Sequence, residues 1–117
     1  MSVVQHEDQL WLDRRPGSRL QVIVDPTGGV SGLALLNQEC APGTGAPSHT
    51  HEFEEVLTIV EGAAEVWVDG ERATVGPGVS AFIPAGAVHG FVNVGGGPLK
   101  LHGVIAATEL SAVFLES

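Results

Sequence analysis

Short apolar runs separated by glycine, proline and aspartate recur along the whole chain, and this spacing limits the fold more than any other feature. Runs of this length are typical of β-strands, and the residues between them are typical of tight turns. Asp69-Gly70, for example, is a two-residue hairpin signal between two such runs. The pattern therefore predicts an all-β chain.

The predicted strands must cover their apolar faces with a second sheet, which favours a sandwich or a jelly-roll barrel. A short helical turn is predicted only near the C-terminus, at Ala106–Leu115. The predicted strands are Leu20–Asp25, Val30–Cys40, Glu54–Val60, Ala63–Val68, Arg72–Val75, Val79–Ile83, His89–Val94 and Leu99–Ile105.

The length of 117 residues predicts a single domain over residues 1–117. No apolar run approaches the roughly 18 residues of a membrane span, and the N-terminus does not resemble a secretory signal. Cys40 is the only cysteine, so the chain cannot form an intrachain disulfide. We therefore expect a cytoplasmic protein. The small size and the strand edges of such a fold also predict a homodimer.

Fourteen acidic residues against five basic residues give a formal charge of −9. Nucleic acid and anionic membranes are therefore not expected as partners, because phosphate binding needs a basic surface. A small molecule remains as the expected ligand. Arg14, Arg15 and Arg19 lie near the N-terminus, far in sequence from the histidines described next, so the sequence does not favour a recess for a strongly anionic substrate.

Two histidines stand two residues apart at His49 and His51, with Glu55 four residues later and His89 further along. In an extended strand His49 and His51 leave the same face, and Glu55 keeps an even offset from both. Imidazoles and a carboxylate together suit a first-row divalent ion. The alternative is that these are ordinary loop histidines after Pro47-Ser48. The combined pattern favours the metal site.

A structural zinc site would more often use several cysteines, which this chain lacks. Three imidazoles and one carboxylate leave about two positions open in octahedral geometry, for water, O2 or a substrate. The residues therefore predict an open, functional site.

The spacing of these residues resembles that of a known family. Two segments match its first and second motifs at every specified position: Gly43-x5-His49-x-His51-x3-Glu55-x6-Gly62 and Gly78-x5-Pro84-x-Gly86-x2-His89-x3-Asn93. The chain thus resembles a small single-domain cupin over a barrel body of about residues 20–106.

The resemblance implies a double-stranded β-helix, which is a jelly-roll barrel, with a metal ion at its mouth. The implied metal ligands are His49, His51, Glu55 and His89. The implied cofactor is one divalent transition metal: iron, manganese, nickel, copper or zinc. We expect Asn93 to form structural hydrogen bonds instead of binding the metal.

Two further residues are predicted to line the substrate pocket. Phe91 shares the parity of His89, and Gln38 lies on the predicted strand before the first motif. Glu54 has an odd offset from His51 and should point away from the site. His102 shares its parity with Lys100, which favours the solvent or interface face.

Three functions remain open. The first is a metal-dependent dioxygenase, an oxidoreductase acting on a small substrate that binds through an enol or hydroxyl oxygen, with Glu55 as general base. The second is a non-redox isomerase or cyclase in which the metal acts only as a Lewis acid. The third is a module that binds a small ligand without catalysis. Oxygen consumption would separate the first two.

Overall fold

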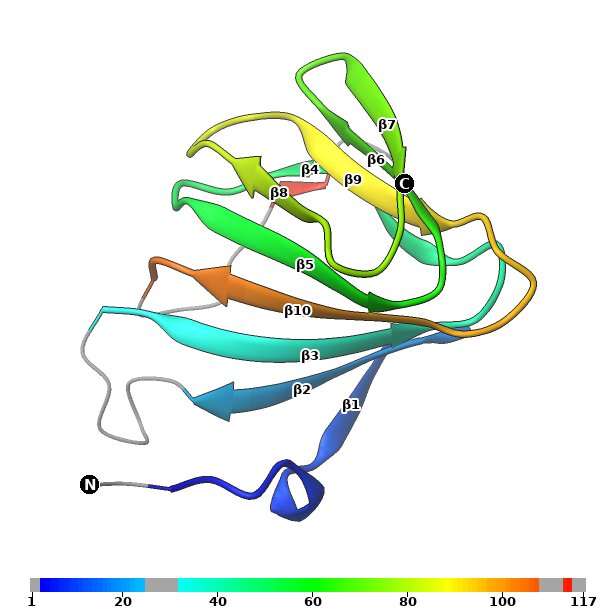
Figure 1. Cartoon of the computed structure of the whole chain (residues 1–117). Helices are drawn as coiled ribbons and strands as arrows, with labels where there is room; N and C mark the ends of the chain where they lie inside the picture. Colours follow the sequence, from blue (N-terminus) through cyan, green and yellow to red (C-terminus); the bar gives the residue numbers. More distant parts are fainter. Residues whose placement is uncertain (1–2, 25–31, 108–112, 115–117) are drawn as a thin grey trace.

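The structure, a computed structural model, describes residues 3–24, 32–107 and 113–114 and consists of two antiparallel sheets that face each other (Figure 1). Sheet A has the strand order β1-β2-β3-β10-β5-β8 and sheet B the order β11-β4-β9-β6-β7. The predicted all-β jelly-roll barrel is confirmed. The elements are η1 (His6–Asp8), β1 (Trp11–Arg15), β2 (Ser18–Val24), β3 (Ala34–Cys40), β4 (Gly45–Thr50), β5 (Glu55–Glu61), β6 (Ala64–Val68), β7 (Glu71–Val75), β8 (Ser80–Ile83), β9 (His89–Asn93), β10 (Leu99–Ile105) and β11 (Val113–Phe114).

Every predicted strand is present, and β10 has the predicted bounds. Within the described residues β3 begins at Ala34, while the predicted start of this strand at Val30 lies outside them. The sequence missed β1, which is mostly charged, and β4, which contains Gly45 and Pro47. Proline is tolerated in a strand at a bulge. Pro47 lies at such a place, because the pairing of β4 with β9 shifts register between Ala46 and His49.

Most of the predicted helical turn at Ala106–Leu115 lies outside the described residues. Within that range Val113–Phe114 form strand β11 and not a helical turn. These two residues pair antiparallel with His49 and Thr50 at the end of β4, which gives their backbone partners in sheet B.

The predicted hairpin at Asp69-Gly70 joins β6 to β7. Both residues have positive φ angles, 47° and 87°, as a two-residue turn matched to strand twist requires. The Asp69 carboxylate also accepts a hydrogen bond from the Val88 N–H at 2.9 Å. The hairpin thereby fixes the residue that precedes His89.

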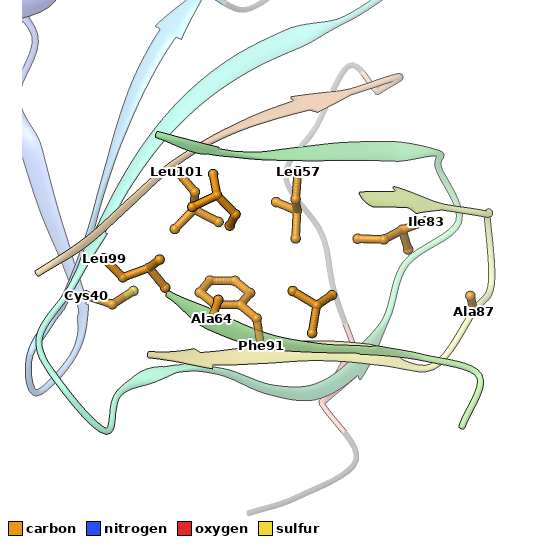
Figure 2. Close-up of a cluster of buried hydrophobic side chains, with 10 residues drawn as sticks. Cys40, Leu57, Ala64, Ile83, Ala87, Phe91, Leu99 and Leu101 are labelled. Carbon is orange, nitrogen blue, oxygen red and sulfur yellow. The ribbon is translucent and has the colours of Figure 1, made fainter. Parts of the chain in front are cut away.

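The main core lies between the two sheets, where apolar side chains point toward one another (Figure 2). Leu57 and Ile59 on β5 and Phe91 on β9 are all buried in it. Alternation along the strands places Glu55 on the inward face of β5 and His89 on the inward face of β9. The same pattern that buries the core therefore brings two predicted ligands into the barrel.

Asn93 joins the turn after β9 to the end of β3 in the other sheet. Its side-chain amide donates hydrogen bonds to the carbonyl oxygens of Cys40 at 3.0 Å and Gly97 at 2.8 Å. Its oxygen accepts one from the Gly95 N–H at 2.9 Å. The predicted structural role of Asn93 is confirmed.

The outer face of sheet A carries exposed apolar side chains at Val56, Phe82 and Val104, which adjoin one another across three strands. The homodimer and the cytoplasmic location stay predictions. Among residues 3–24, 32–107 and 113–114, no helix is long and apolar enough to cross a membrane.

Replacing Phe91 by alanine should lower the free energy of unfolding by about 3–5 kcal/mol, because it leaves a cavity in the core. Chemical denaturation measures this change. Phe82→Ala is the matched control: Phe82 is 57% exposed, so its loss should change stability by less than about 0.5 kcal/mol. Equal effects of the two substitutions would contradict the assignment of Phe91 to the core.

Candidate metal centre

The four predicted ligands come together at one end of the barrel. His49 lies near the end of β4, opposite His89, which is the first residue of β9. His51 follows β4, and Glu55 is the first residue of β5. All four are buried, with His89 only 1% exposed. Nitrogen atoms of the three histidines lie within 4.8 Å of one another.

The even offsets of Glu55 from His49 and His51 suggest a single strand, but Glu55 begins β5 whereas His49 lies on β4. The chain turns after His51, so Glu55 enters from sheet A while His49 and His89 lie on sheet B. The site therefore lies between the sheets. Glu54 is exposed, as its odd offset predicts.

Each imidazole is held by a backbone carbonyl two residues away. The Nδ1 atoms of His49, His51 and His89 donate to the carbonyl oxygens of Pro47, Phe53 and Ala87 at 2.8, 2.8 and 2.9 Å. A carbonyl oxygen only accepts, so the proton of each neutral ring lies on Nδ1. This arrangement fixes the ring orientation and leaves the Nε2 lone pair for a metal ion.

Two of the three Nε2 atoms, those of His51 and His89, lie beside a carboxylate. Glu55 Oε1 lies 3.1 Å from His51 Nε2 and 3.5 Å from His89 Nε2. His89 Nε2 is buried and has no hydrogen-bond partner in the part of the chain that the structure describes. Lone pairs that face one another in a buried site need a cation between them. The donor set fits a divalent transition metal; Glu55 as the fourth ligand stays a prediction.

The pKa values agree with this chemistry. Burial lowers the pKa of His49 to about 4, so its ring is neutral and able to bind metal near pH 7. Burial alone would raise the pKa of Glu55, but the adjacent His51 and His89 side chains outweigh it and lower that pKa to about 2. Glu55 is therefore ionised.

A cavity of about 410 Å³ opens onto His49, His51 and Glu55. Gln38, predicted to line the pocket, does line it. Phe53 lines it too and stacks on the His51 ring, with centroids 4.0 Å apart and an angle of 4° between planes. Sequence reasoning assigned no pocket role to Phe53; its position between two ligands was the available signal.

Gly103 on β10 leaves space beside these polar groups. A Cβ at this position would lie 3.1 Å from Glu55 Oε2 and 3.7 Å from Gln38 Nε2. The glycine thus allows the Glu55 carboxylate and the Gln38 amide to occupy the same corner of the cavity.

Phe91 and His102 lie away from the cavity. Phe91 does point inward like His89, but it lies two residues deeper and packs in the core instead of lining the pocket. The correction follows from depth along the strand, which parity does not report. His102 lies on the outer face of sheet A, where Nδ1 is hydrogen-bonded to Asn37 Oδ1. Its predicted outward orientation is confirmed.

The arginines near the N-terminus were expected to lie away from the histidines, and this expectation is wrong. Arg14, Arg15 and Arg19 all border the same cavity as His49 and His51. The reason is the pairing of β1 with β2, whose Ser18 and Leu20 form part of the cavity wall. Residues that are far apart in the sequence therefore lie close together in the fold.

The family model for the cupin domain matches residues 37–113. The chain belongs to the cupin family. This cupin is 34% identical to the polyketide synthase CurC of Streptomyces cyaneus over 89 residues, which are 71% of this chain and 55% of that protein. The chain therefore spans about half the length of this curated relative.

Solved structures agree with the assignment. The polyketide cyclase RemF from Streptomyces resistomycificus is 27% identical, with a TM-score of 0.83 over 100% of this chain and 87% of that chain. An RmlC-like cupin from Shewanella frigidimarina is also 27% identical, with a TM-score of 0.75 over 88% of each chain. This cupin is thus similar both to a polyketide cyclase and to an RmlC-like cupin.

The metal-free cupin should lose stability as the pH falls below about 6.5. The folded-state pKa of His49, about 4, lies below its ordinary value of 6.5, so the unfolded chain takes up this proton first. The stabilisation is complete above pH 6.5 and is lost toward pH 4. Glu55 adds a loss at lower pH, between its ordinary pKa of 4.5 and about 2. Thermal unfolding across this range measures both.

A His49→Asn variant is the control, since it removes one titrating group while keeping a polar side chain. Its stability should depend less on pH between 6.5 and 4. An unchanged slope in this variant would contradict the assignment to His49.

Proposed function

We propose that this cupin is a metal-dependent, non-redox enzyme that closes rings in small molecules with several carbonyl groups. The observation that carries the proposal is the cluster of three imidazoles beside an ionised carboxylate, of which His49, His51 and Glu55 line one cavity. The similarity to the polyketide cyclase RemF supports this reaction class. The similarity to CurC supports it as well.

His49, His51 and His89 would hold the metal ion through Nε2, with Glu55 beside them. When bound, such an ion supplies Lewis acidity that polarises a substrate carbonyl. The backbone carbonyls on the Nδ1 atoms keep the three rings in position. Phe53 provides a flat apolar surface that keeps water from one side of His51.

Glu55 is assigned the role of general base. Its low pKa keeps it ionised, the form that accepts a proton, but also makes it a weak base. A weak base needs an acidic C–H bond, and a carbon between two carbonyl groups provides one. Glu55 removes this proton, the carbon attacks a second carbonyl, and the new alkoxide oxygen takes up a proton. Loss of water completes the ring without change of oxidation state.

A dioxygenase is the second candidate, because three imidazoles and one carboxylate also suit Fe(II) with open positions for substrate and O2. In that case Glu55 serves the same base role before O2 reacts. Binding without catalysis is less favoured, since all four predicted ligands are present and brought together.

Glu55→Gln should reduce the rate of cyclisation of a linear triketone by about 10²–10⁴-fold, because the amide cannot accept the proton. Ultraviolet absorption of the conjugated enone product follows the reaction with the zinc-loaded protein. Glu54→Gln is the matched control: this neighbouring carboxylate is exposed and should leave the rate unchanged.

The same assay run with an oxygen electrode separates the two candidates. Ring closure without O2 uptake, equal in air and under nitrogen, is the expected outcome. Stoichiometric O2 uptake by the iron-loaded protein would contradict the cyclase and establish the dioxygenase.

A further inference from the structure

The few basic residues of this acidic chain are concentrated on one cavity. The chain carries 14 acidic and five basic residues, yet three of the five border the cavity that His49 and His51 line. Glu55 is the one carboxylate among the described residues that line it. A local excess of cationic groups in a recess attracts anions even when the whole protein is negative.

A β-bulge brings two consecutive arginines to this cavity. In the pairing of β1 with β2, Asp13 lies opposite Arg19 and Arg15 lies opposite Ser18, so Arg14 is the extra residue. Side chains normally alternate between faces, and a bulge breaks this alternation. Arg14 and Arg15 consequently both line the cavity.

The three arginines differ in exposure and in the partners of their guanidinium groups. Arg19 is committed to Glu39, with Nη2 at 2.7 Å from Oε1, and its guanidinium lies 4.1 Å from the centre of the Trp11 ring. Arg14 is exposed and forms no ion pair with any described residue. Arg15 is half-buried. Arg15 also has an interaction of its own, so Arg14 is the least committed of the three cationic groups at the cavity.

The arginines of β1 lie far from Glu55 along sheet A. Glu55 pairs with Ile105, the last residue of β10. Arg15 pairs with Ser18, and Ser18 pairs with Cys40. Cys40 in turn pairs with Leu99, the first residue of β10. Ile105 and Leu99 are six residues apart, which is about 20 Å at roughly 3.3 Å per residue. Of the residues that line the cavity, those on β1 and Ser18 therefore lie about one strand length from Glu55 along the sheet.

We propose that the substrate of this cupin is an elongated oxyanion whose carboxylate or phosphate binds Arg14 and Arg15 while its carbonyl groups reach the histidine end. The proposal rests on the proposed function for the identity of the reacting end. Guanidinium groups match carboxylate and phosphate oxygens with paired hydrogen bonds, which also fix orientation. The arginines thereby determine which carbonyls lie beside Glu55.

Binding of matched probes to the zinc-loaded full chain tests this proposal by calorimetry. The probes are 1,3-diketones on a flexible spacer, ending in a carboxylate, a phosphate or an uncharged methyl ester. The diketone binds through the metal end in all three. An anionic probe should bind about tenfold or more tightly than the ester, and the difference should shrink with added salt.

Arg14→Gln and Arg15→Gln should each reduce the preference for the anion while leaving the affinity for the ester unchanged. Arg72→Gln is the matched control, since Arg72 is an exposed arginine on β7 outside this cavity. The metal content of each variant confirms that it remains folded. The preferred anion identifies the source, a carboxylic acid or a phosphorylated carrier.

Equal binding of all three probes to the unaltered protein would overturn the oxyanion proposal and leave the metal site intact. Retention of the preference in a variant that lacks both arginines would overturn it too. Failure of every diketone to bind the metal-loaded protein would instead contradict the proposed function. The two failures are thus distinguishable.

Discussion

The burial of three imidazoles and a carboxylate in an apolar barrel is the constraint on which the rest of the site depends. Polar groups in such a place are costly unless each has a partner. The backbone carbonyls satisfy the Nδ1 side of every ring, but the Nε2 atoms face one another and Glu55. A divalent ion between them would remove this conflict. The core beneath holds the strands that carry these side chains in place.

The fold and the clustering of the three histidines could be predicted because both follow from local patterns. Alternation and turn residues revealed most strands, and the two motifs specified the ligands at fixed spacings. Strand β4 was missed because Gly45 and Pro47 are typical of turns. Only the pairing with β9 across a bulge shows that this segment is a strand.

The position of a residue along the barrel axis and the pairing of distant strands could not be predicted from the sequence. Phe91 has the correct parity for the pocket but lies in the core, since parity says nothing of position along the barrel axis. Arg14 and Arg15 were assigned to a region away from the site, yet pairing of β1 with β2 brings them to the cavity. Both cases concern tertiary placement, which local pattern does not encode.

The cavity combines two kinds of functional group. The first kind is imidazoles and an ionised carboxylate, the groups that activate carbonyl compounds. The second kind is cationic side chains in an otherwise acidic protein. Membership of the cupin family and similarity to RemF are consistent with chemistry at the first kind.

The central claim is that the histidine cluster holds a metal ion, and metal content measured by plasma mass spectrometry tests it most directly. Purified tag-free protein should carry about one transition-metal ion per chain, which His89→Ala should lose while remaining folded. His102→Ala, a histidine on the outer face, should keep it. Full metal content in a folded His89→Ala protein, or equal loss in both variants, would contradict the account.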